Sequence, residues 1–592
     1  MQALLDQLHS TLIKGFEELY DSKPNEKQIQ IQKTRKEFEG DFTLNVFPFL
    51  RITRSKPEET AQNLGDYLKE NVEEVKDYNV IKGFLNLSLS ENFWRNTLKS
   101  AIENERFGLK ENSGRTVLVE FASPNTNKPL HLGHLRNIFL GYSVSNILNA
   151  NGHNVVNTQI INDRGIHICK SMVAWKEYGN GQTPEDAGLK GDHFVGDYYV
   201  KFDQVYKEQI KDLISQGTTE DDAKEQAPIM KQARETLSKW EQGDAETVAL
   251  WEKMNNWVYS GFDVTYNTMG VDFDKLYYES ETYIKGRDVV KKGLKDGSFF
   301  EKDNGSIWVD LTKEGLDEKL LLRADGTAVY MTQDIGTAIQ RSEDFPKMDQ
   351  MVYTVGNEQD YHFQVLFKIL DKLGYDWAKN CYHLSYGMVE LPDGKMKSRE
   401  GNVVDADDIM AEMKERALEQ GKDRGSYEEM PDQEREELAR KVGMAALKYF
   451  ILKVDPKKNM TFNPEESVDM NGNTGPFIQY TYARTASILR KAGEVSLNFS
   501  DGEFDDKERE LVKMIASFPE LIEEAGEQFN PGAVANYCYD LAKVYNGFYQ
   551  NTPIFGADDQ ETINWRLGLT KKVGDILKTG MGLLGVEMPE RF

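Results

Sequence analysis

The chain has 592 residues, of which 39% are hydrophobic, 29% charged and 11% aromatic, so it can form about three to five packed domains and shows no compositional sign of disorder. Its 72 basic and 98 acidic residues give a formal net charge of −26, which disfavours indiscriminate nucleic-acid coating but permits a selective RNA partner on a locally basic face. There is no uncharged apolar run of 18 residues and only three scattered cysteines, so we expect no membrane span, disulfide framework or structural zinc site, and a reducing cytoplasm.

The first predicted unit covers residues 1–112. It opens with an amphipathic helix that carries several acidic residues, which is not typical of a secretory signal or transit peptide. Its segment 81–90, IKGFLNLSLS, alternates apolar and polar side chains as a half-buried strand does. We therefore expect an N-terminal α/β domain, followed by a linker at 111–114.

The second unit, 113–429, begins with a βαβ pattern. A β-rich apolar run at 116–121 is followed by a Pro/Asn loop, a helix that stops at Asn151, and a second strand at 153–163. This pattern is the building block of a doubly wound parallel sheet, so a Rossmann-like α/β domain is expected. Charged helices over about 180–265 predict a helical insertion. Further strands are predicted at 306–311, 328–334, 350–356 and 381–391.

The last unit, 430–592, consists of segments with long apolar faces at helical spacing. This pattern predicts an independent all-α bundle. The expected fold class is therefore α/β, with an N-terminal α/β domain, a Rossmann-like parallel-sheet domain with a helical insertion, and a C-terminal all-α bundle.

Two histidines stand where the first βα loop enters its helix, in the string His131-Leu132-Gly133-His134. Residues three apart share one helical face, and a helix N-terminus offers unpaired N–H groups and a positive dipole. Gly133 leaves room for a ligand, so imidazole donors here suit the phosphates of ATP and the charge that develops on a leaving pyrophosphate. The alternatives are partly buried helix-start residues or a metal pair, although no third ligand follows at metal spacing.

A second basic element follows about 260 residues later, at 394–404. Its glycine-bounded string GKMKSREGNVV holds Lys395, Lys397 and Arg399 around Ser398, and such a loop can close over a triphosphate. The alternative is a solvated basic turn. Its pairing with the histidine motif on one predicted sheet favours the nucleotide interpretation.

These two motifs resemble the signatures of class I aminoacyl-tRNA synthetases, and the strings around them resemble the arginyl-tRNA synthetases. The matching strings extend over essentially the whole chain beyond residue 112: VEFASPNTNKPLHLGHLRN, YMTQDIGTA, NEQDYHFQ, NTGPFIQYTYAR, YDLAKVYN and GVEMPERF. The N-terminal segment resembles that family's additional tRNA-contacting domain, and the resemblance makes the C-terminal bundle an anticodon-binding domain.

The resemblance implies a two-step reaction. L-arginine and ATP, accompanied by Mg²⁺, give arginyl-adenylate and pyrophosphate, and the arginyl group then passes to the 3′ end of tRNA(Arg). It also implies a cytoplasmic monomer without a protein-bound structural metal and without membrane association. The alternatives are the cysteinyl branch, whose zinc site the isolated cysteines do not support, and a tRNA-binding paralogue without activity.

In the family that the chain resembles, both signatures serve ATP. The implied ATP-binding residues are His131, His134, His362 and Met396, and the implied catalytic set is His131, Gly133, His134, Lys128, Lys395, Lys397 and Ser398. One position departs from the family pattern, because Ser398 stands where the second signature lysine is usual. Either Lys397, one place earlier, or Lys128, just before the histidine motif, replaces it.

A guanidinium substrate has five donors and is best matched by planar carboxylates. Tyr330 and Asp334 are four apart, so they reach one cleft if Asp334 opens a helix, and Glu120 ends the first strand of the sheet, where ligands bind in such folds. The resemblance implies an arginine-binding set of Glu120, Asn125, Tyr330, Asp334 and Gln359, with Glu279 as a weaker candidate. The alternatives are core packing for Tyr330, helix capping for Asp334, and ordinary turn or helix-start positions for Gln359 and His362.

Aromatic side chains are dense in the last unit. Most are expected in the bundle core, because aromatics at helical spacing usually pack, whereas recognition of RNA loops uses exposed rings for stacking. The resemblance implies anticodon-loop contacts from Phe477, Tyr480 and Phe592. Candidates for phosphate contacts, with a solvated face as the alternative, are Arg484, Arg490 and Lys491.

Overall fold

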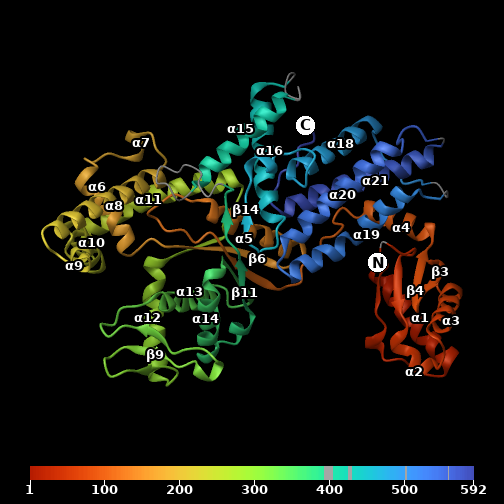
Figure 1. Ribbon diagram of the computed structural model, residues 1–592, viewed down its shortest axis with the longest axis horizontal. Coiled ribbons are helices and arrows are strands. Elements are labelled where there is room, and N and C mark those ends of the chain that lie inside the picture. The colour runs from red at the N-terminus through yellow and green to blue at the C-terminus, as the bar shows by residue number, and fades with distance from the viewer. Residues whose placement is uncertain (36, 393–403, 424–429, 500–502, 558) are drawn as a thin grey trace.

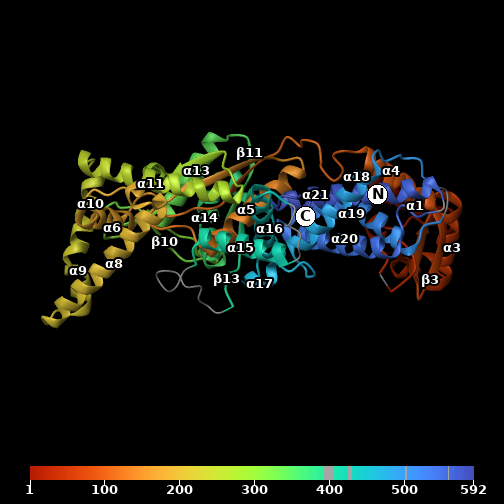
Figure 2. The same ribbon diagram turned by 90° about the horizontal axis from the view of Figure 1, so that it is seen from above.

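The computed structural model describes residues 1–592 except 36, 393–403, 424–429, 500–502 and 558. The molecule is elongated (Figure 1). The N-terminal residues and the C-terminal helices lie together at one end, the parallel sheet occupies the middle, and a group of helices projects at the other end, as the view from above also shows (Figure 2). Within the described ranges, no helix combines the length and the apolarity needed to cross a membrane.

The N-terminal part is a four-stranded antiparallel sheet with helices packed on it. In the order β1-β2-β4-β3, its strands are β1 (Ile31–Lys33), β2 (Phe42–Asn45), β4 (Phe84–Leu89) and β3 (Val75–Ile81). Its helices are α1 (Gln2–Tyr20), α2 (Leu50–Thr53), α3 (Pro57–Asn71) and α4 (Glu91–Glu103). Helix α1 buries Leu8, Leu12 and Phe16 at helical spacing. The predicted opening helix and the predicted strand within 81–90 are confirmed.

The central sheet has five parallel strands in the order β12-β11-β5-β6-β7. They are β12 (Cys381–Tyr386), β11 (Met348–Gly356), β5 (Thr116–Glu120), β6 (Asn154–Ile161) and β7 (Lys275–Tyr278). The chain runs outward from β5 through β6 and β7 and then reverses to β11 and β12, so the doubly wound prediction is confirmed. In such sheets ligands bind at the carboxyl ends of the strands where the order reverses, which here is between β5 and β11.

One predicted strand is a helix. Residues 328–334 were expected to extend, but α13 (Tyr330–Asp344) begins inside them, so that prediction is wrong. Helix α13 buries Met331, Ile335 and Ala338, which follow helical spacing and belong to one buried apolar cluster. The prediction holds only for Ala328, which forms an antiparallel bridge with Leu322, and for Val329, which is extended before the helix begins.

Residues 306–311 are extended only at β9 (Ile307–Val309), which lies outside the parallel sheet. It forms an antiparallel sheet with β8 (Phe300–Glu301) and β10 (Lys319–Leu322). The predicted strand at 381–391 is divided between β12 and the short β13 (Val389–Glu390), which pairs in parallel with β14 (Met460–Thr461). These additions surround the parallel sheet without extending it.

Helices account for most of the remaining described chain. The projecting group between β6 and β7, called the helical excursion below, consists of α6 (Ile166–Tyr178), α7 (Pro184–Ala187), α8 (Gly191–Ser215), α9 (Glu220–Gln226), α10 (Pro228–Glu241) and α11 (Ala245–Met269). Two helices flank the sheet, α12 (Glu279–Lys295) and α14 (Asp360–Lys372). The C-terminal part contains α15 (Ala406–Asp423), α16 (Asp432–Leu452), α17 (Pro464–Ser467), α18 (Gly475–Ala492), α19 (Asp506–Glu527), α20 (Pro531–Asn551) and α21 (Gln560–Leu583). The predicted helical insertion and all-α C-terminal part are confirmed.

Helix α5 (Leu132–Ala150) joins the sheet to the C-terminal helices. It buries thirteen of its residues and contacts β6 and β11 of the sheet as well as α16, α19, α20 and α21. Ser143 donates to the Leu583 carbonyl at 3.1 Å, and Asn151, just past the helix end, donates to the Ile522 carbonyl at 2.7 Å. A single buried helix thus begins at the reversal of strand order and ends against the bundle.

The N-terminal part is attached to the bundle by ion pairs between residues 418 to 487 positions apart. The pairs are Glu91 with Arg509, Asp41 with Lys513, and Lys33 with Glu520. An open cavity of about 960 Å³, lined by residues of α4 and α19 among others, lies between the two parts. Beside this cavity α4 packs on α19 and α21 in one buried apolar cluster, so the ion pairs add to an apolar contact.

Candidate active site

The start of α5 holds the two motif histidines as a pair of hydrogen-bond donors. His131 is the N-cap residue, and its ring Nδ1 accepts from the Gly133 backbone N–H at 3.1 Å. The ring Nδ1 of His134 accepts from the backbone N–H of His131, also at 3.1 Å. A ring nitrogen that accepts a hydrogen bond carries no proton, so Nε2–H is the donor of each neutral imidazole.

Burial keeps both rings neutral. It lowers the pKa of His131 to about 4, with a contribution from the charge of Lys128, and it holds the pKa of His134 well below its usual range. Lys128 is exposed, yet its charge acts on both rings. A fixed positive charge therefore stands beside two neutral donors at a helix N-terminus, which is an arrangement suited to a polyphosphate.

The segment after the second signature returns to the histidine motif. The Leu132 N–H donates to the Val404 carbonyl at 3.0 Å, and the Ala406 N–H donates to the Leu130 carbonyl at 3.0 Å. The signature residues themselves, Lys395, Met396, Lys397, Ser398 and Arg399, lie outside the described residues. The chain just beyond them, at Val404 and Ala406, is hydrogen-bonded to the start of α5.

The turn after β5 contains a strained residue. Ala122 has a φ of +67°, a left-handed conformation that costs about 1 kcal/mol or more for a residue with a Cβ. Its N–H donates to Asn137 Oδ1 at 2.6 Å, and its carbonyl accepts from Gln159 Nε2 at 3.1 Å. Asn137 also donates to the Thr354 carbonyl of β11 at 2.7 Å. Sequence reasoning missed Asn137, although it stands one turn after His134 on the same helix.

Asp334 and His362, expected at arginine and at ATP respectively, lie in contact. Asp334 is in the second turn of α13, and its Oδ2 is 2.5 Å from Nε2 of His362 on α14, so it does not cap its helix. Tyr330, one turn earlier, is 76% exposed, which excludes core packing. Gln359 is exposed in the turn η4 (Asn357–Gln359) directly after β11. These residues lie around the carboxyl end of β11, at the reversal of strand order.

A second carboxylate, Glu279 of α12, lies within the electrostatic reach of Asp334. Glu279 is the first residue of that helix and is only 8% exposed. Burial raises its pKa to about 7; the charge of Arg164 and a hydrogen bond with Gln333 oppose the rise, whereas the charges of Asp163 and Asp334 add to it. Neighbouring carboxylates repel each other, and a cation bound between them relieves both. The pair suits a guanidinium, whose planar donors can match two carboxylates.

Asp163 fixes the start of α12 and thereby Glu279. It follows β6, is buried, and accepts from the Ser280 N–H at 2.9 Å and the Ser280 hydroxyl at 2.8 Å. The Tyr259 hydroxyl of α11 donates to it at 3.3 Å. Asp163 was not among the predicted site residues. Its place at the carboxyl end of the second strand of the βαβ unit was the signal that could have found it.

Glu120 lies at the carboxyl end of β5, as expected, but the chain itself supplies a cation for it. The fully buried Arg341 of α13 pairs with Glu120 Oε2, and the Ser123 hydroxyl donates to Oε1 at 3.0 Å. Arg341 thus lies on Oε2 and the Ser123 hydroxyl on Oε1, so both oxygens of Glu120 are already bound by groups of the chain, and a lone pair of Oε1 is what it can offer a ligand. Asn125 is exposed in the following loop and forms a parallel bridge with Asn162.

The expected tRNA-contacting aromatics lie on and near α18. Tyr480 is 41% exposed and packs edge-to-face on Phe592, with ring centroids 5.7 Å apart. The Arg484 guanidinium lies 5.0 Å from the Tyr480 ring and 4.8 Å from the Tyr549 ring of α20. Phe477 is half-buried against Tyr539. The structure thus brings Tyr480 and Phe592 together at the surface and places Phe477 deeper.

Known proteins match the chain over its whole length. The family model "tRNA synthetases class I (R), catalytic domain" matches residues 97–463, "Arginyl tRNA synthetase N terminal domain" matches 3–89, and "DALR anticodon binding domain" matches 478–592. Proteins named arginine–tRNA ligase from Bacteroides thetaiotaomicron and Parabacteroides distasonis are each 55% identical, over 99% of this chain and 99% of theirs. The solved arginyl-tRNA synthetase of Thermus thermophilus is 26% identical and superposes with a TM-score of 0.80 over 99% of this chain and 100% of its own. The chain therefore belongs to the arginyl-tRNA synthetase family of class I aminoacyl-tRNA synthetases.

Proposed function

We propose that the chain is an arginine–tRNA ligase, which activates L-arginine with ATP and transfers the arginyl group to the 3′ end of tRNA(Arg). The observation that carries the proposal is that the carboxylates of Asp334 and Glu279, close enough for their charges to interact, lie at the same sheet edge as the donors of His131 and His134. The acidic pair selects a guanidinium side chain, and the donors bind a triphosphate. Their placement at the reversal of strand order puts the two substrates side by side.

In the first step an oxygen of the arginine carboxylate attacks the α-phosphorus of ATP, and the bond to pyrophosphate breaks. Negative charge grows on the departing phosphates, and the Nε2–H groups of His131 and His134 donate to it. Gly133 leaves the approach open, because a Cβ at this position would lie 3.0 Å from the His131 ring. Mg²⁺ enters with ATP as part of the substrate. In the second step a terminal ribose hydroxyl of tRNA attacks the arginyl carbonyl, and AMP leaves.

The second signature completes the nucleotide site in this proposal. Its residues Lys395, Met396, Lys397 and Ser398 contribute to ATP binding and to the activation step, together with Lys128 and His362. Of the two lysines that can replace the missing signature lysine, we assign the role to Lys128, because its charge already acts on both histidine rings.

The arginine set divides by chemistry. Asp334 and Glu279 bind the guanidinium, and Tyr330 covers it with its exposed ring. Asn125 and Gln359 offer side-chain amides for the substrate's amino and carboxylate groups. Glu120, with Arg341 on Oε2 and the Ser123 hydroxyl on Oε1, offers the remaining lone pair of Oε1 to the substrate's ammonium group.

The RNA side of the proposal uses the two ends of the chain. Residues 1–112 form the additional tRNA-contacting domain, 113–429 the catalytic domain, and 430–592 the anticodon-binding domain, with Phe477, Tyr480 and Phe592 at the anticodon loop. The protein acts as a cytoplasmic monomer.

Arginine-dependent exchange of pyrophosphate into ATP tests the proposal. The full chain is assayed with each of the twenty amino acids, with and without tRNA. We expect exchange with arginine alone among the twenty. Exchange with another amino acid, or none with any in the presence of tRNA(Arg), would contradict the proposed activity.

A further inference from the structure

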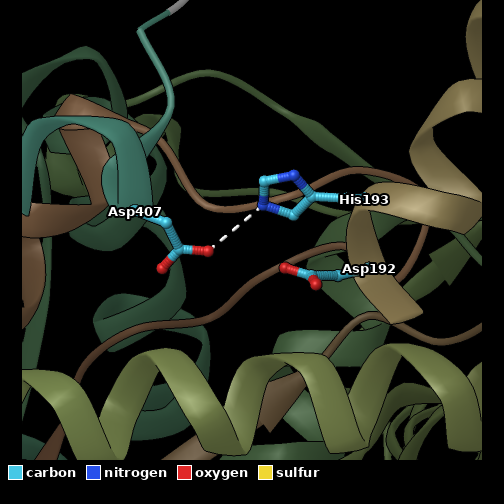
Figure 3. Close-up of side chains that lie close together, drawn as sticks. All are labelled: Asp192, His193 and Asp407. Carbon is cyan, nitrogen blue, oxygen red and sulfur yellow. Dashed lines mark hydrogen bonds and ion pairs between the residues drawn. The ribbon is translucent and has the colours of Figure 1, made fainter. Parts of the chain in front are cut away.

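Five charged side chains meet where the helical excursion touches the chain next to the histidine motif. They are Lys190, Asp192 and His193 at the start of α8, and Asp405 and Asp407 at the start of α15. Figure 3 shows Asp192 and His193 on one side and Asp407 on the other. We call this cluster the junction.

Asp407 is the centre of the junction. Its Oδ2 accepts from His193 Nε2 at 3.1 Å and from the ammonium of Lys190, and its Oδ1 accepts from the Thr265 hydroxyl of α11 at 3.0 Å. Burial acts to raise the pKa of this carboxyl, but the hydrogen bonds from His193 and Lys190 outweigh it and lower the pKa to about 2. Asp407 is therefore ionised at neutral pH and binds α8 and α11 to the start of α15.

The residue two places before Asp407 pairs with the histidine motif. Asp405 and His131 form an antiparallel bridge, and Asp405 Oδ1 accepts from the backbone N–H of Asp407 at 2.8 Å. The same His131 accepts the capping hydrogen bond from Gly133 that defines its donor nitrogen. Asp407 is thus connected through Asp405 to the backbone of His131.

Asp192, His193 and Asp407 also have the composition of a metal site, with ligand atoms within 4.8 Å of one another. The position of Lys190 favours a salt-bridged joint instead. Its Nζ lies 3.2 Å from Asp192 Oδ2 and also binds Asp407 Oδ2. The ammonium thus lies between the two carboxylates that a metal ion would have to bridge, and its positive charge opposes the entry of a second cation.

We propose that Asp407, bound by His193 and Lys190, is a positioning residue for adenylate formation, because it fixes the backbone of His131 through Asp405. This inference rests on the proposed function. A misplacement of about 1 Å in a catalytic group can lower the reaction rate roughly 100-fold. Because His131 acts on charge that develops during the reaction, we expect loss of Asp407 to slow adenylate formation and to leave substrate binding unchanged.

Asp407→Asn tests the proposal, because it keeps the shape and removes the charge. Single-turnover adenylate formation is measured with saturating ATP and arginine in the presence of tRNA. We expect the rate to fall about ten- to hundredfold, while the arginine KM stays within about twofold. Asp408→Asn is the matched control, since Asp408 is the exposed neighbour in the same turn, and its rate stays at the wild-type value. An unchanged rate in Asp407→Asn overturns the proposal.

A double-mutant cycle separates positioning from a merely structural role. In a His131→Asn background, Asp407→Asn is expected to lower the rate less than about threefold further, because both changes act through one group. If the rate loss of the double variant equals the product of the losses of the two single variants, the proposal is overturned. Lys190→Arg keeps the cation and is expected to retain most of the rate that Lys190→Met loses. If Asp407→Asn does not fold, His193→Gln carries the same test with Lys190 still on Asp407.

Two further outcomes are distinguishable. Calorimetric titration of Zn²⁺ or Mn²⁺ into the wild type and Asp192→Asn is expected to show no difference; one bound ion in the wild type that Asp192→Asn abolishes overturns the proposal in favour of a metal site. Absence of arginine-dependent exchange in the wild type refutes the proposed function itself. Wild-type exchange with an unaffected Asp407→Asn variant refutes the positioning role alone.

Discussion

The histidines at the start of α5 share one hydrogen-bonding scheme, in which each Nδ1 accepts a backbone N–H and each Nε2–H remains the donor. His134→Ala removes one donor and one cap for the His131 N–H. We expect adenylate formation to fall about 10²- to 10³-fold with the arginine Kd within twofold, because the lost donor acts on charge that develops in the transition state. Single-turnover kinetics and calorimetry measure the two quantities. Thermal unfolding is the control, since loss of the cap costs about 1 kcal/mol. An unchanged rate would mean that the histidine pair only caps the helix.

Lys128 and Lys397 are the two candidates for the missing signature lysine. Lys128→Ala is expected to slow the activation step more than Lys397→Ala, because Lys128 sits beside the helix N-terminus where its charge reaches both histidines. Single-turnover adenylate formation with tRNA present compares the two variants, after circular dichroism has shown that both fold. A larger loss in Lys397→Ala would reverse the assignment.

Glu279 makes arginine binding depend on pH. Its pKa of about 7 means that a proton must leave before the carboxylate can bind a guanidinium. We expect the arginine Kd to rise up to about tenfold for each pH unit below 7, and to lose this dependence in Glu279→Gln, whose binding is weaker throughout. His131, with a pKa of about 4, stays neutral over this range and does not contribute. Calorimetry from pH 5.5 to about 8 checks the slope.

Glu279 also makes the free energy of unfolding depend on pH. A carboxyl whose pKa is raised by folding stabilises the protein fully below its ordinary pKa of 4.5, and that contribution is lost as the pH rises from 4.5 to about 7. Glu279→Gln removes the penalty, so the variant gains up to about 3 kcal/mol relative to wild type above pH 7. Thermal unfolding without arginine at pH 6 and at pH 8 measures the gain, and an equal difference at both values would argue against a raised pKa.

The sequence could place the donors and acceptors of the site but not their partners. His131, His134, Asp334 and Gln359 were predicted because their strings stand at helix starts or match a family pattern. The partner of Glu120 was not predicted, because Arg341 is 221 residues away and no local sequence pattern distinguishes it from other arginines. The nearness of Glu279 to Asp334 likewise depends on how two helices pack, which the sequence does not state.

Those two helices, α12 and α13, touch through their backbones. A Cβ at Gly286 of α12 would lie 1.9 Å from the Thr332 carbonyl oxygen of α13, and one at Gly336 would lie 2.5 Å from the Gly286 nitrogen. Gly286→Ala therefore forces the helices apart and separates Glu279 from Asp334. We expect a loss of about 1 to 3 kcal/mol of stability and an arginine KM raised on the order of tenfold.

Gly547→Ala provides the control for that change. Gly547 lies inside α20 with open space around its Cβ position, so alanine there is expected to stabilise by up to about 1 kcal/mol and leave the arginine KM unchanged. Thermal unfolding and pyrophosphate exchange are measured for both variants. Equal arginine KM values in the two would show that the Glu279–Asp334 pair tolerates the shift.

Elements with strong local patterns were predicted and those defined by distant pairing were not. The β5–α5–β6 unit follows from an apolar run, a cap, a stop and a second run within about 50 residues. The strand order of the sheet does not follow from local patterns, because β5 pairs with β11, which lies more than 200 residues later in the chain. Edge strand β7 was missed because its four residues, KLYY, do not alternate. The start of α13 was mistaken for a strand because only four residues carried the apolar signal.

At the scale of the whole molecule, the N-terminal part contacts the bundle through the packing of α4 on α19 and α21 and through ion pairs beside an open cavity. Asp41→Asn keeps the acceptor for the Leu89 N–H and removes the charge that binds Lys513. We expect the attachment to weaken by about 1 to 2 kcal/mol, so that amide exchange in α4 and α19 speeds roughly 5- to 30-fold, and more so in salt. Hydrogen-exchange mass spectrometry measures it. Asp21→Asn, an exposed change at the end of α1, is the control. Unaltered exchange would show that the apolar contacts suffice.

The same ion pairs have a consequence for synthesis on the ribosome. Arg509, the ion-pair partner of Glu91, is synthesised 418 residues after it. At a translation rate of about 5 to 20 residues per second, the interval between the two residues is roughly 20 to 80 s. The N-terminal sheet can form early, but it docks only after the bundle helices have emerged. The part of the chain made first is therefore the last to gain its final contacts, and a translational pause before codon 509 lengthens the time for which its docking face is open to other molecules.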